Sequence, residues 1–158
     1  MPSKKILSPV LFIFLLMLIS SSGIAQDTFK AEMLKEVNNV RREGCQCGDE
    51  YMPPVRPLYW NDKLEKAAKS HARDMYSNNF FNHEGSRGKT LKDRVNATGY
   101  KWSFIGENIS WGYYSVKEVV QGWIDSPDHC RNMMHPDFME LGAAREGTYW
   151  VLDMGERR

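Results

Sequence analysis

The sequence lacks the short motifs that mark several large enzyme classes. It contains neither the HExxH zinc motif nor the G-x-S-x-G turn that presents a nucleophilic serine. No segment repeats and none has low complexity, which excludes repeat arrays. A large charge of one sign is also absent, since the formal net charge is only +1. Nothing in the electrostatics therefore points to nucleic acid or an anionic membrane as a partner.

Only one long hydrophobic run is present, and it lies near the N-terminus. Lys4 and Lys5 precede an uninterrupted apolar stretch over residues 10–19, and Gly23 and Ala25 occupy the −3 and −1 positions of a cleavage site. Ten apolar residues are too few to cross roughly 30 Å of hydrocarbon. The pattern therefore predicts a secretory signal peptide.

Cleavage after Ala25 would separate a leader, residues 1–25, from one domain over residues 26–158. Loss of the two leader lysines would change the formal charge from +1 to −1. No cysteine follows the cleavage site, so no lipid anchor is expected there, and no transmembrane segment remains. We expect a secreted protein, extracellular or periplasmic.

Cysteine is scarce, and its number is odd. Cys45, Cys47 and Cys130 allow three pairings, and export makes a disulfide the expected state. A bridge between Cys45 and Cys47 would be badly strained. We favour Cys47–Cys130, with Cys45–Cys130 as the nearest alternative and three free thiols as the remaining one.

The periodicity of apolar residues predicts several helices. One starts at Asp27 or Thr28 and stops at Gly44, and a second starts with Asp62 as its cap. Shorter helices are expected over residues 91–97 and from Ser115, with a further turn opened by Pro127.

The remaining segments predict strands and one long loop. Residues 45–60 carry three prolines and read as a loop, whereas "FIGENISWG" reads as a short strand. "LGAAREGTYWVLDMG" predicts a hairpin that turns at Glu146-Gly147. Helices combined with a small antiparallel sheet define an α+β domain with the sheet between helical layers.

Three polar residues in glycine- or proline-punctuated settings form the candidate site. They are His83 in "FFNHEGSRG", Glu107 in "IGENIS" and His129 in "SPDHCRN". A carboxylate in an apolar strand is costly to bury unless it is paired or ligated. Two imidazoles and a carboxylate are suitable donors for a divalent metal, although their spacing matches no local metal motif.

Nucleophilic chemistry is disfavoured. Ser126 lies close to His129 without a nucleophile elbow, and Cys130 is directly adjacent to that histidine. Adjacent side chains do not generally point a thiolate and its base at each other. His71 lies on the apolar face of a predicted helix, so we interpret it as a core histidine outside the site.

Four blocks of the sequence, taken in order, resemble the signatures of one family. The blocks are "HARDMYSNNFFNHEG", "GYKWSFIGENIS", "VVQGWIDSPDHCRNMMHPDFMELGAA" and "YWVLDMG". They are similar to the CAP superfamily of cysteine-rich secretory, antigen and pathogenesis-related proteins, in its bacterial secreted form. The resemblance runs from about Val37 to Gly155.

The resemblance implies an α–β–α sandwich whose central cleft holds a tetrad of His, Glu, Glu or Ser, and His. Matched by motif, His83, Glu107 and His129 take three of these positions, and Ser126 takes the fourth in place of a carboxylate. The neighbouring Asp125 is a carboxylate that could turn into the cleft. The pairing Cys47–Cys130 also resembles that of some bacterial members.

What the resemblance implies about function is a secreted binding module for a lipid, sterol or cell-envelope ligand. The cleft would accept Zn²⁺ or another divalent cation. The first alternative is a metal-assisted, peptidase-like hydrolase with Glu107 as its catalytic base. The second is a structural protein whose polar cluster specifies the fold. Aromatic residues close to the blocks could contact a ligand: Phe80, Phe81, Trp102, Trp111, Tyr113 and Tyr114. The sequence does not indicate the oligomeric state.

Overall fold

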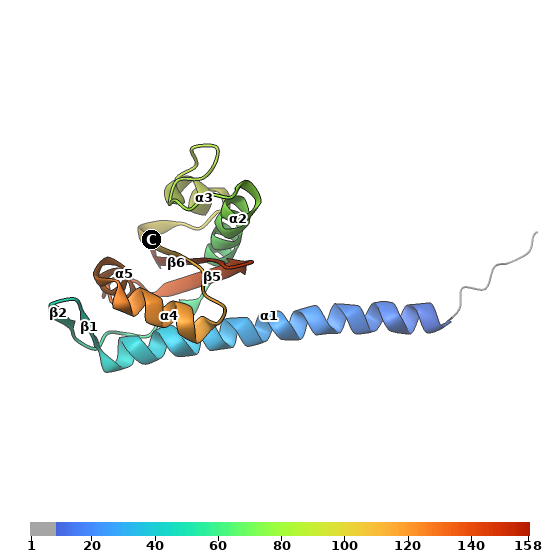
Figure 1. Cartoon of the computed structure of the whole chain (residues 1–158), viewed down its shortest axis with the longest axis horizontal. Coiled ribbons are helices and arrows are strands. Elements are labelled where there is room, and N and C mark those ends of the chain that lie inside the picture. Colours follow the sequence, from blue (N-terminus) through green and yellow to red (C-terminus); the bar gives the residue numbers. More distant parts are fainter. Residues whose placement is uncertain (1–8) are drawn as a thin grey trace, which may run out of the picture.

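The computed structural model describes residues 9–158, with side chains from residue 25 onward. Its first element, α1 (Pro9–Glu43), is one continuous helix whose N-terminal part projects beyond the domain (Figure 1). The predicted start at Asp27 or Thr28 is therefore wrong, because the segment between the apolar run and Asp27 contains no proline and the helix continues through Gly23. The predicted stop is confirmed, since Gly44 has a φ of +75°.

Within residues 9–158, no helix combines the length and hydropathy that a membrane span requires. The predicted cleavage after Ala25 falls inside α1, and the leader stays a prediction. The positive n-region at Lys4 and Lys5 lies outside the described residues.

A four-stranded sheet forms the middle of the domain. Its strands are β3 (Tyr59–Trp60), β4 (Trp102–Trp111), β5 (Glu140–Glu146) and β6 (Tyr149–Arg157). The spatial order is β3-β5-β6-β4, with the short β3 parallel to β5 and the other pairs antiparallel. The predicted hairpin is confirmed as β5–β6, and β4 is an edge strand.

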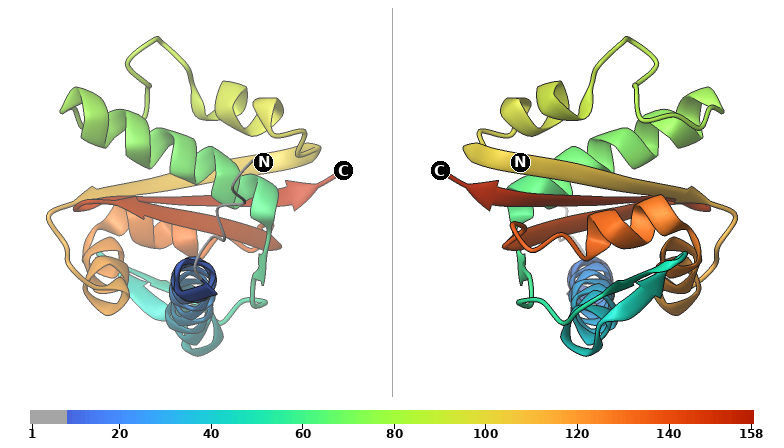
Figure 2. Two further views of the ribbon diagram at one scale, coloured as in Figure 1. Left: turned by 90° about the vertical axis from the view of Figure 1, so that its right-hand side faces the viewer. Right: turned by 90° about the vertical axis from the view of Figure 1, so that its left-hand side faces the viewer.

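Helices cover both faces of this sheet (Figure 2). One face carries α2 (Asp62–Asn78) and α3 (Leu91–Ala97). The other carries α1, α4 (Val116–Asp125) and α5 (Pro127–Met133). The predicted α–β–α sandwich is confirmed.

Side-chain caps fix where three helices begin. Thr90 with Asp93 and Ser115 with Glu118 form capping boxes at α3 and α4. At α2 the cap is Asn61, whose side chain accepts hydrogen bonds from the backbone of Lys63 and Leu64. The predicted cap Asp62 is wrong by one residue, because both Asn and Asp can cap and stand side by side here.

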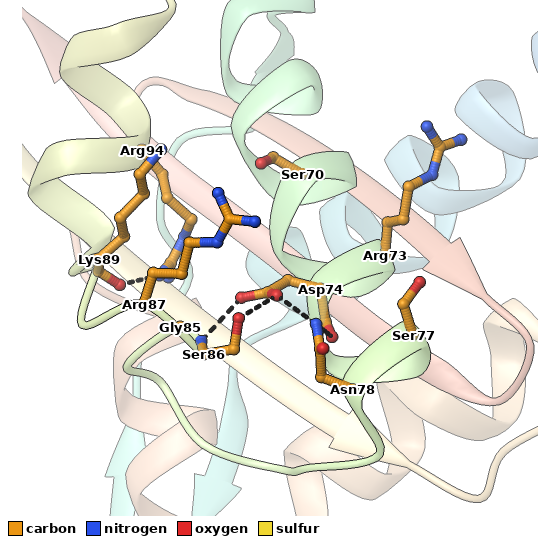
Figure 3. Close-up of a pocket in the computed structure, with 10 residues that line it drawn as sticks. All are labelled: Ser70, Arg73, Asp74, Ser77, Asn78, Gly85, Ser86, Arg87, Lys89 and Arg94. Atoms are coloured by element: carbon orange, nitrogen blue, oxygen red, sulfur yellow. Dashed lines mark hydrogen bonds between the residues drawn. The ribbon is translucent and has the colours of Figure 1, made fainter.

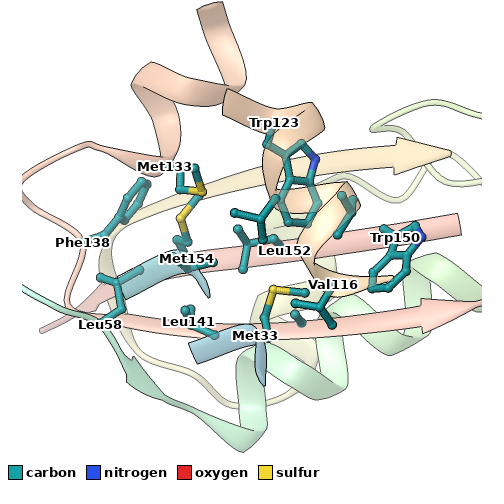
Figure 4. Packing of buried hydrophobic residues seen from close by; sticks show 14 residues of the cluster. Met33, Leu58, Val116, Trp123, Met133, Phe138, Leu141, Trp150, Leu152 and Met154 are labelled. Atoms are coloured by element: carbon teal, nitrogen blue, oxygen red, sulfur yellow. The ribbon is translucent and has the colours of Figure 1, made fainter. Parts of the chain in front are cut away.

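The larger core fills the space between the sheet and the helices α1, α4 and α5 (Figure 4). Alternation along β6 directs Trp150, Leu152 and Met154 into this core. Tyr149 and Val151, on the opposite face of β6, pack with α2. Asp153 follows the same alternation and therefore belongs to the face that α2 covers.

The segment predicted as a loop contains a small hairpin. Strands β1 (Cys45–Cys47) and β2 (Glu50–Met52) pair in antiparallel register. Cys47 forms a disulfide with Cys130 of α5, with their Cα atoms 5.4 Å apart, and Cys45 is a free thiol. This is the favoured pairing, and it attaches the hairpin to α5.

A buried arginine fixes the C-terminal end of α1 to the segments around α5. The Arg41 guanidinium donates hydrogen bonds to the carbonyls of Arg56, Met133, His135 and Phe138 at 2.7–3.3 Å. Burial lowers its pKa to about 10, which leaves it charged at neutral pH. These bonds help to hold α5, the helix that carries His129, against the domain.

Candidate functional site

Strand β4 presents its side chains alternately to the two faces of the sheet. Ile109 packs with α2, so Glu107, two residues earlier, lies on that same face. Gly106 and Asn108 face α5 instead. The Glu107 residue is only 8% exposed, which makes its charge depend on the partners that the protein supplies.

Residues 79–90, between α2 and α3, carry His83 and are attached to α2 at two points. His71, buried in α2, lies with Nε2 2.8 Å from the carbonyl of Asn82. Asp74 accepts hydrogen bonds from the backbone N–H and hydroxyl of Ser86 at 2.9 and 2.6 Å (Figure 3). A Cβ on Gly85 would lie 2.9 Å from the Asp74 carboxylate, so the close approach needs glycine. His71 thus acts as the predicted core histidine and also positions the residue before His83.

His83 and Glu107 are in direct contact. His83 Nδ1 lies 2.7 Å from Glu107 Oε1. The His83 side chain is 56% exposed, whereas that of Glu107 is 2% exposed. The pair therefore joins a buried carboxylate to an imidazole at the surface.

Arg94 of α3 completes the environment of this carboxylate, although nothing in the sequence singles it out. Its Nη2 donates to Glu107 Oε2 at 2.6 Å, and the arginine side chain is 3% exposed. Its Nη1 donates to the carbonyls of His83 and Lys89 at 3.0 and 2.9 Å. One guanidinium thus balances the buried charge and fixes the backbone that presents His83.

The state of Glu107 follows from these contacts. Burial by itself would raise its pKa, but the His83 hydrogen bond and the Arg94 charge outweigh burial and lower the pKa below its usual value. An ionised carboxylate can only accept, so the proton lies on His83 Nδ1. Nε2 is then the His83 nitrogen that remains available to a ligand.

A second buried carboxyl lies directly beside Glu107. Asp153 of β6 is the register partner of Glu107, is fully buried and has no hydrogen-bond partner for either oxygen within the described structure. Burial and the negative charge of Glu107 raise the pKa of Asp153 well above its usual value. Burial next to a carboxylate therefore favours the neutral form of Asp153, and Arg94 balances the charge of Glu107.

His129 approaches the edge strand from the opposite side. It lies on α5, and its carbonyl accepts a hydrogen bond from Asn108 Nδ2 at 2.9 Å. Asn132 Nδ2 donates to the Glu107 carbonyl at 3.2 Å, and a Cβ on Gly106 would lie 2.7 Å from Asn132 Oδ1. These contacts hold α5 against β4.

The two candidate histidines interact electrostatically. Burial lowers the pKa of His129, and the proximity of His83 lowers it further, so His129 is neutral at pH 7. His83 contacts Glu107 from the α2–α3 side of the sheet, and His129 belongs to α5 on the other side, so the two histidines flank the edge strand β4. We use the term candidate cleft for the surface between them.

The fourth predicted position adds no carboxylate to this cleft. Ser126 is half-buried between α4 and α5 and does not cap α5 with its side chain. Asp125 is exposed and accepts a hydrogen bond from Gln121 at 2.8 Å on the surface of α4. Asp125 therefore does not take the place of the missing carboxylate.

These donors do not fit an enclosed divalent metal site. Both Glu107 oxygens are engaged, by His83 and by Arg94, which leaves two imidazoles as possible ligands. Across the described residues, the only ligand trio within 4.8 Å of one another is Cys45, Cys47 and Cys130. Structural and catalytic zinc sites use at least three protein ligands. The positive charge of Arg94 already balances the Glu107 carboxylate, as a bound metal ion would.

The domain has the fold of several bacterial proteins of known structure. An extracellular protein with an SCP domain from Bacillus anthracis superposes with a TM-score of 0.67 at 21% identity, over 82% of this chain and 41% of that one. An outer surface protein of Borrelia burgdorferi gives 0.66 at 21% identity, over 84% of this chain and 92% of that one. A cysteine-rich secretory protein from Staphylococcus aureus gives 0.66 at 15% identity, over 83% and 39%. At these identities the likeness concerns the fold alone.

Sequence relatives are found in Bacillus subtilis. The protein YkwD is 30% identical over 99 residues, 61% of this chain and 38% of its own length. The membrane protein YlbC is 29% identical over 100 residues, 63% of this chain and 29% of its own length. The matched region thus spans about a third of either relative.

Residues 34–153 match the cysteine-rich secretory protein family, CAP. This match covers most of the chain and contains every residue of the candidate site. Together with the α–β–α sandwich, it defines the class of the molecule as a CAP domain. The chain belongs to the CAP family, as the four sequence blocks predict.

Proposed function

We propose that the protein is an exported CAP-domain binding module that takes a lipid, sterol or cell-envelope ligand at the cleft over β4. One observation carries this proposal: the Glu107 carboxylate is fully engaged by Arg94 and His83. A carboxylate in that state is neither a free general base nor a free metal ligand. The cleft therefore offers recognition groups, an exposed His83 and a neutral His129, rather than a prepared reaction centre.

A groove that begins just after the end of β4 and contains two tyrosines supports a ligand with apolar surface. It has a volume of about 520 Å³ and lies between α4 and the turn that follows β4. Tyr113 and Tyr114 line it, and Tyr114 is 72% exposed. Trp111, at the end of β4, is 60% exposed. Ligand sites commonly have this size and combine aromatic walls with a few polar groups.

Export is supported by two independent features. The N-terminal sequence has the charge, apolar run and small residues of a cleavable leader. The Cys47–Cys130 disulfide requires an oxidising compartment to persist. Secretion to the cell exterior or the periplasm satisfies both.

Hydrolysis is the second candidate, and a specific contact favours a form of it. Glu107 orients His83 through Nδ1, so Nε2 could accept a proton from water or from a substrate. His83, rather than Glu107, would then be the catalytic base, and no metal would take part. A peptide or ester substrate cleaved by the wild type and left intact by His83→Gln would favour this candidate.

Ligand binding is tested with three defined probes: palmitate, cholesterol and muramyl dipeptide. We expect one of them to bind, as measured by native mass spectrometry and tryptophan fluorescence. Tyr114→Ala is expected to weaken binding by about tenfold, since a buried aromatic contact contributes roughly 1.4 kcal/mol or more. His83→Ala is expected to weaken binding without unfolding the domain, because the side chain is largely exposed.

The matched control is Tyr51→Ala, which removes a tyrosine of β2 that is 58% exposed and lies outside the groove. This variant should bind as the wild type does. If no probe binds, or if Tyr51→Ala and Tyr114→Ala lose the same affinity, the proposal is wrong. Unfolding of His83→Ala would instead favour a purely structural role for the polar cluster.

A further inference from the structure

Three sulfur atoms lie together where β1 meets α5. Cys45 Sγ is 3.2 Å from Cys130 Sγ and 3.6 Å from Cys47 Sγ. Cys45 and Cys47 are separated by one residue on β1, so alternation directs both side chains to the same face of the strand. That face meets α5, which carries Cys130.

The free thiol lies beside the disulfide rather than at one end of it. Its distances to the two bonded sulfurs differ by only a few tenths of an ångström. A thiolate that displaces one sulfur of a disulfide attacks along the S–S axis, far from the leaving sulfur. The arrangement is a triangle suited to a shared central ligand rather than to exchange.

The surroundings of the triangle are apolar and rich in sulfur. Cys47, Cys130 and Met134 are fully buried in one cluster, against which Met52 packs. The neighbouring side chains that complete the cluster are Val40, Val55 and Ile124. Thiolate and thioether groups are soft ligands, which select Cu(I) over hard cations.

We propose that the reduced form of Cys45, Cys47 and Cys130 binds one Cu(I) ion through three sulfur atoms. With metal–sulfur bonds of about 2.3 Å, a trigonal site has sulfur–sulfur edges of about 4 Å. The distances from Cys45 Sγ to Cys47 Sγ and to Cys130 Sγ are each less than 1 Å shorter than such an edge. When the disulfide is reduced, the sulfur atoms of Cys47 and Cys130 can move apart to form the third edge.

The disulfide controls access to this site. A thiol or phosphine reductant supplies two electrons, and with two protons the Cys47–Cys130 bond becomes two thiols. Together with Cys45 they form three Cu–S bonds and release up to three protons to solvent, while copper remains Cu(I). Since the thiols lose protons on binding, the affinity for Cu(I) rises with pH.

Zinc is the weaker fit. Zinc favours four ligands and accepts histidine and carboxylate groups as well as thiolate. In the described part of the chain, the only group of three or more potential metal ligands consists of these three cysteines, two of which are joined in the disulfide. Trigonal coordination by sulfur alone is a geometry that Cu(I) accepts more readily than Zn²⁺.

The test is an anaerobic titration of the purified, phosphine-reduced protein with Cu(I), in competition with bicinchoninate. We expect one Cu(I) per chain, and a rise in the thermal midpoint of the reduced protein as copper is added. Cys45→Ser keeps the disulfide for folding, and its reduced form should bind Cu(I) at least about tenfold more weakly. The oxidised wild type should bind none, and His83→Gln should match the wild type.

Several results would overturn the proposal. They are the absence of Cu(I) uptake by the reduced protein, equal uptake by Cys45→Ser, loss of uptake in His83→Gln, and Zn²⁺ binding as tight as that of Cu(I). If reduction unfolds the chain, added Cu(I) should restore the near-ultraviolet circular dichroism of the native fold. A reduced chain that stays unfolded with Cu(I) would equally contradict the site.

Discussion

Replacing Arg94 by methionine is expected to destabilise the domain by about 3–5 kcal/mol at pH 7. The change keeps the apolar volume but leaves the Glu107 carboxylate, 2% exposed, without its cation. It also removes the hydrogen bonds to the carbonyls of His83 and Lys89. The loss should shrink as the pH falls, because protonation of Glu107 removes the unpaired charge. Urea denaturation at several pH values measures it.

The double variant Arg94→Met, Glu107→Gln separates the charge from the packing. It removes the buried charge together with its partner, so we expect it to recover about half or more of the lost free energy. Arg87→Met, an exposed arginine between α2 and α3, is the matched control and should cost less than about 0.5 kcal/mol. A small effect of Arg94→Met, or no recovery in the double variant, would show that the ion pair does not control the site.

Cys130→Ala is expected to destabilise the domain by about 4 kcal/mol, because the lost bridge closes a loop of 83 residues. Cys47→Ala should cost distinctly less. Cys45 Sγ already lies 3.2 Å from Cys130 Sγ and can form the bridge instead. Thermal and urea unfolding measure the stabilities, and alkylation with mass spectrometry counts the free thiols.

Cys45→Ala is the control for the disulfide and should unfold as the wild type does. In Cys47→Ala, the alkylated protein should contain no free thiol. Equal destabilisation by Cys47→Ala and Cys130→Ala, with a free thiol in Cys47→Ala, would mean that the triangle of sulfurs is too rigid for the alternative bridge.

Much of the fold could be predicted because local signals agree with tertiary packing. Local signals fix the start of α3, the start of α4 and the turn of the β5–β6 hairpin within a few residues. These signals are the capping boxes at Thr90 and Ser115 and the positive φ of Gly147. The start of α1 could not be predicted from its caps, since the helix continues through Asp27 into the apolar run. The hairpin β1–β2 was missed because its two strands have only three residues each and are attached to α5 by a disulfide.

The candidate site was predicted only in part. His83, Glu107 and His129 stand out in sequence because glycine and proline surround them, and the structure brings the first two into contact. Arg94 gave no such signal, since an arginine on a short helix is normally exposed. Asp153 could have been recognised, because it shares a strand face with Tyr149 and Val151. No local sequence pattern indicates that Arg94 of α3 and Asp153 of β6 both lie beside Glu107.

The direct test of the central claim is the zinc content of the oxidised protein after dialysis against Zn²⁺ at neutral pH. Cys45 is alkylated first so that no thiol contributes. Because Arg94 and His83 satisfy Glu107 without a metal, we expect well below one zinc per chain by mass spectrometry. The wild type, His83→Ala and His129→Ala should not differ. One zinc per chain, lost in both folded variants, would contradict this claim and make the cleft a metal site.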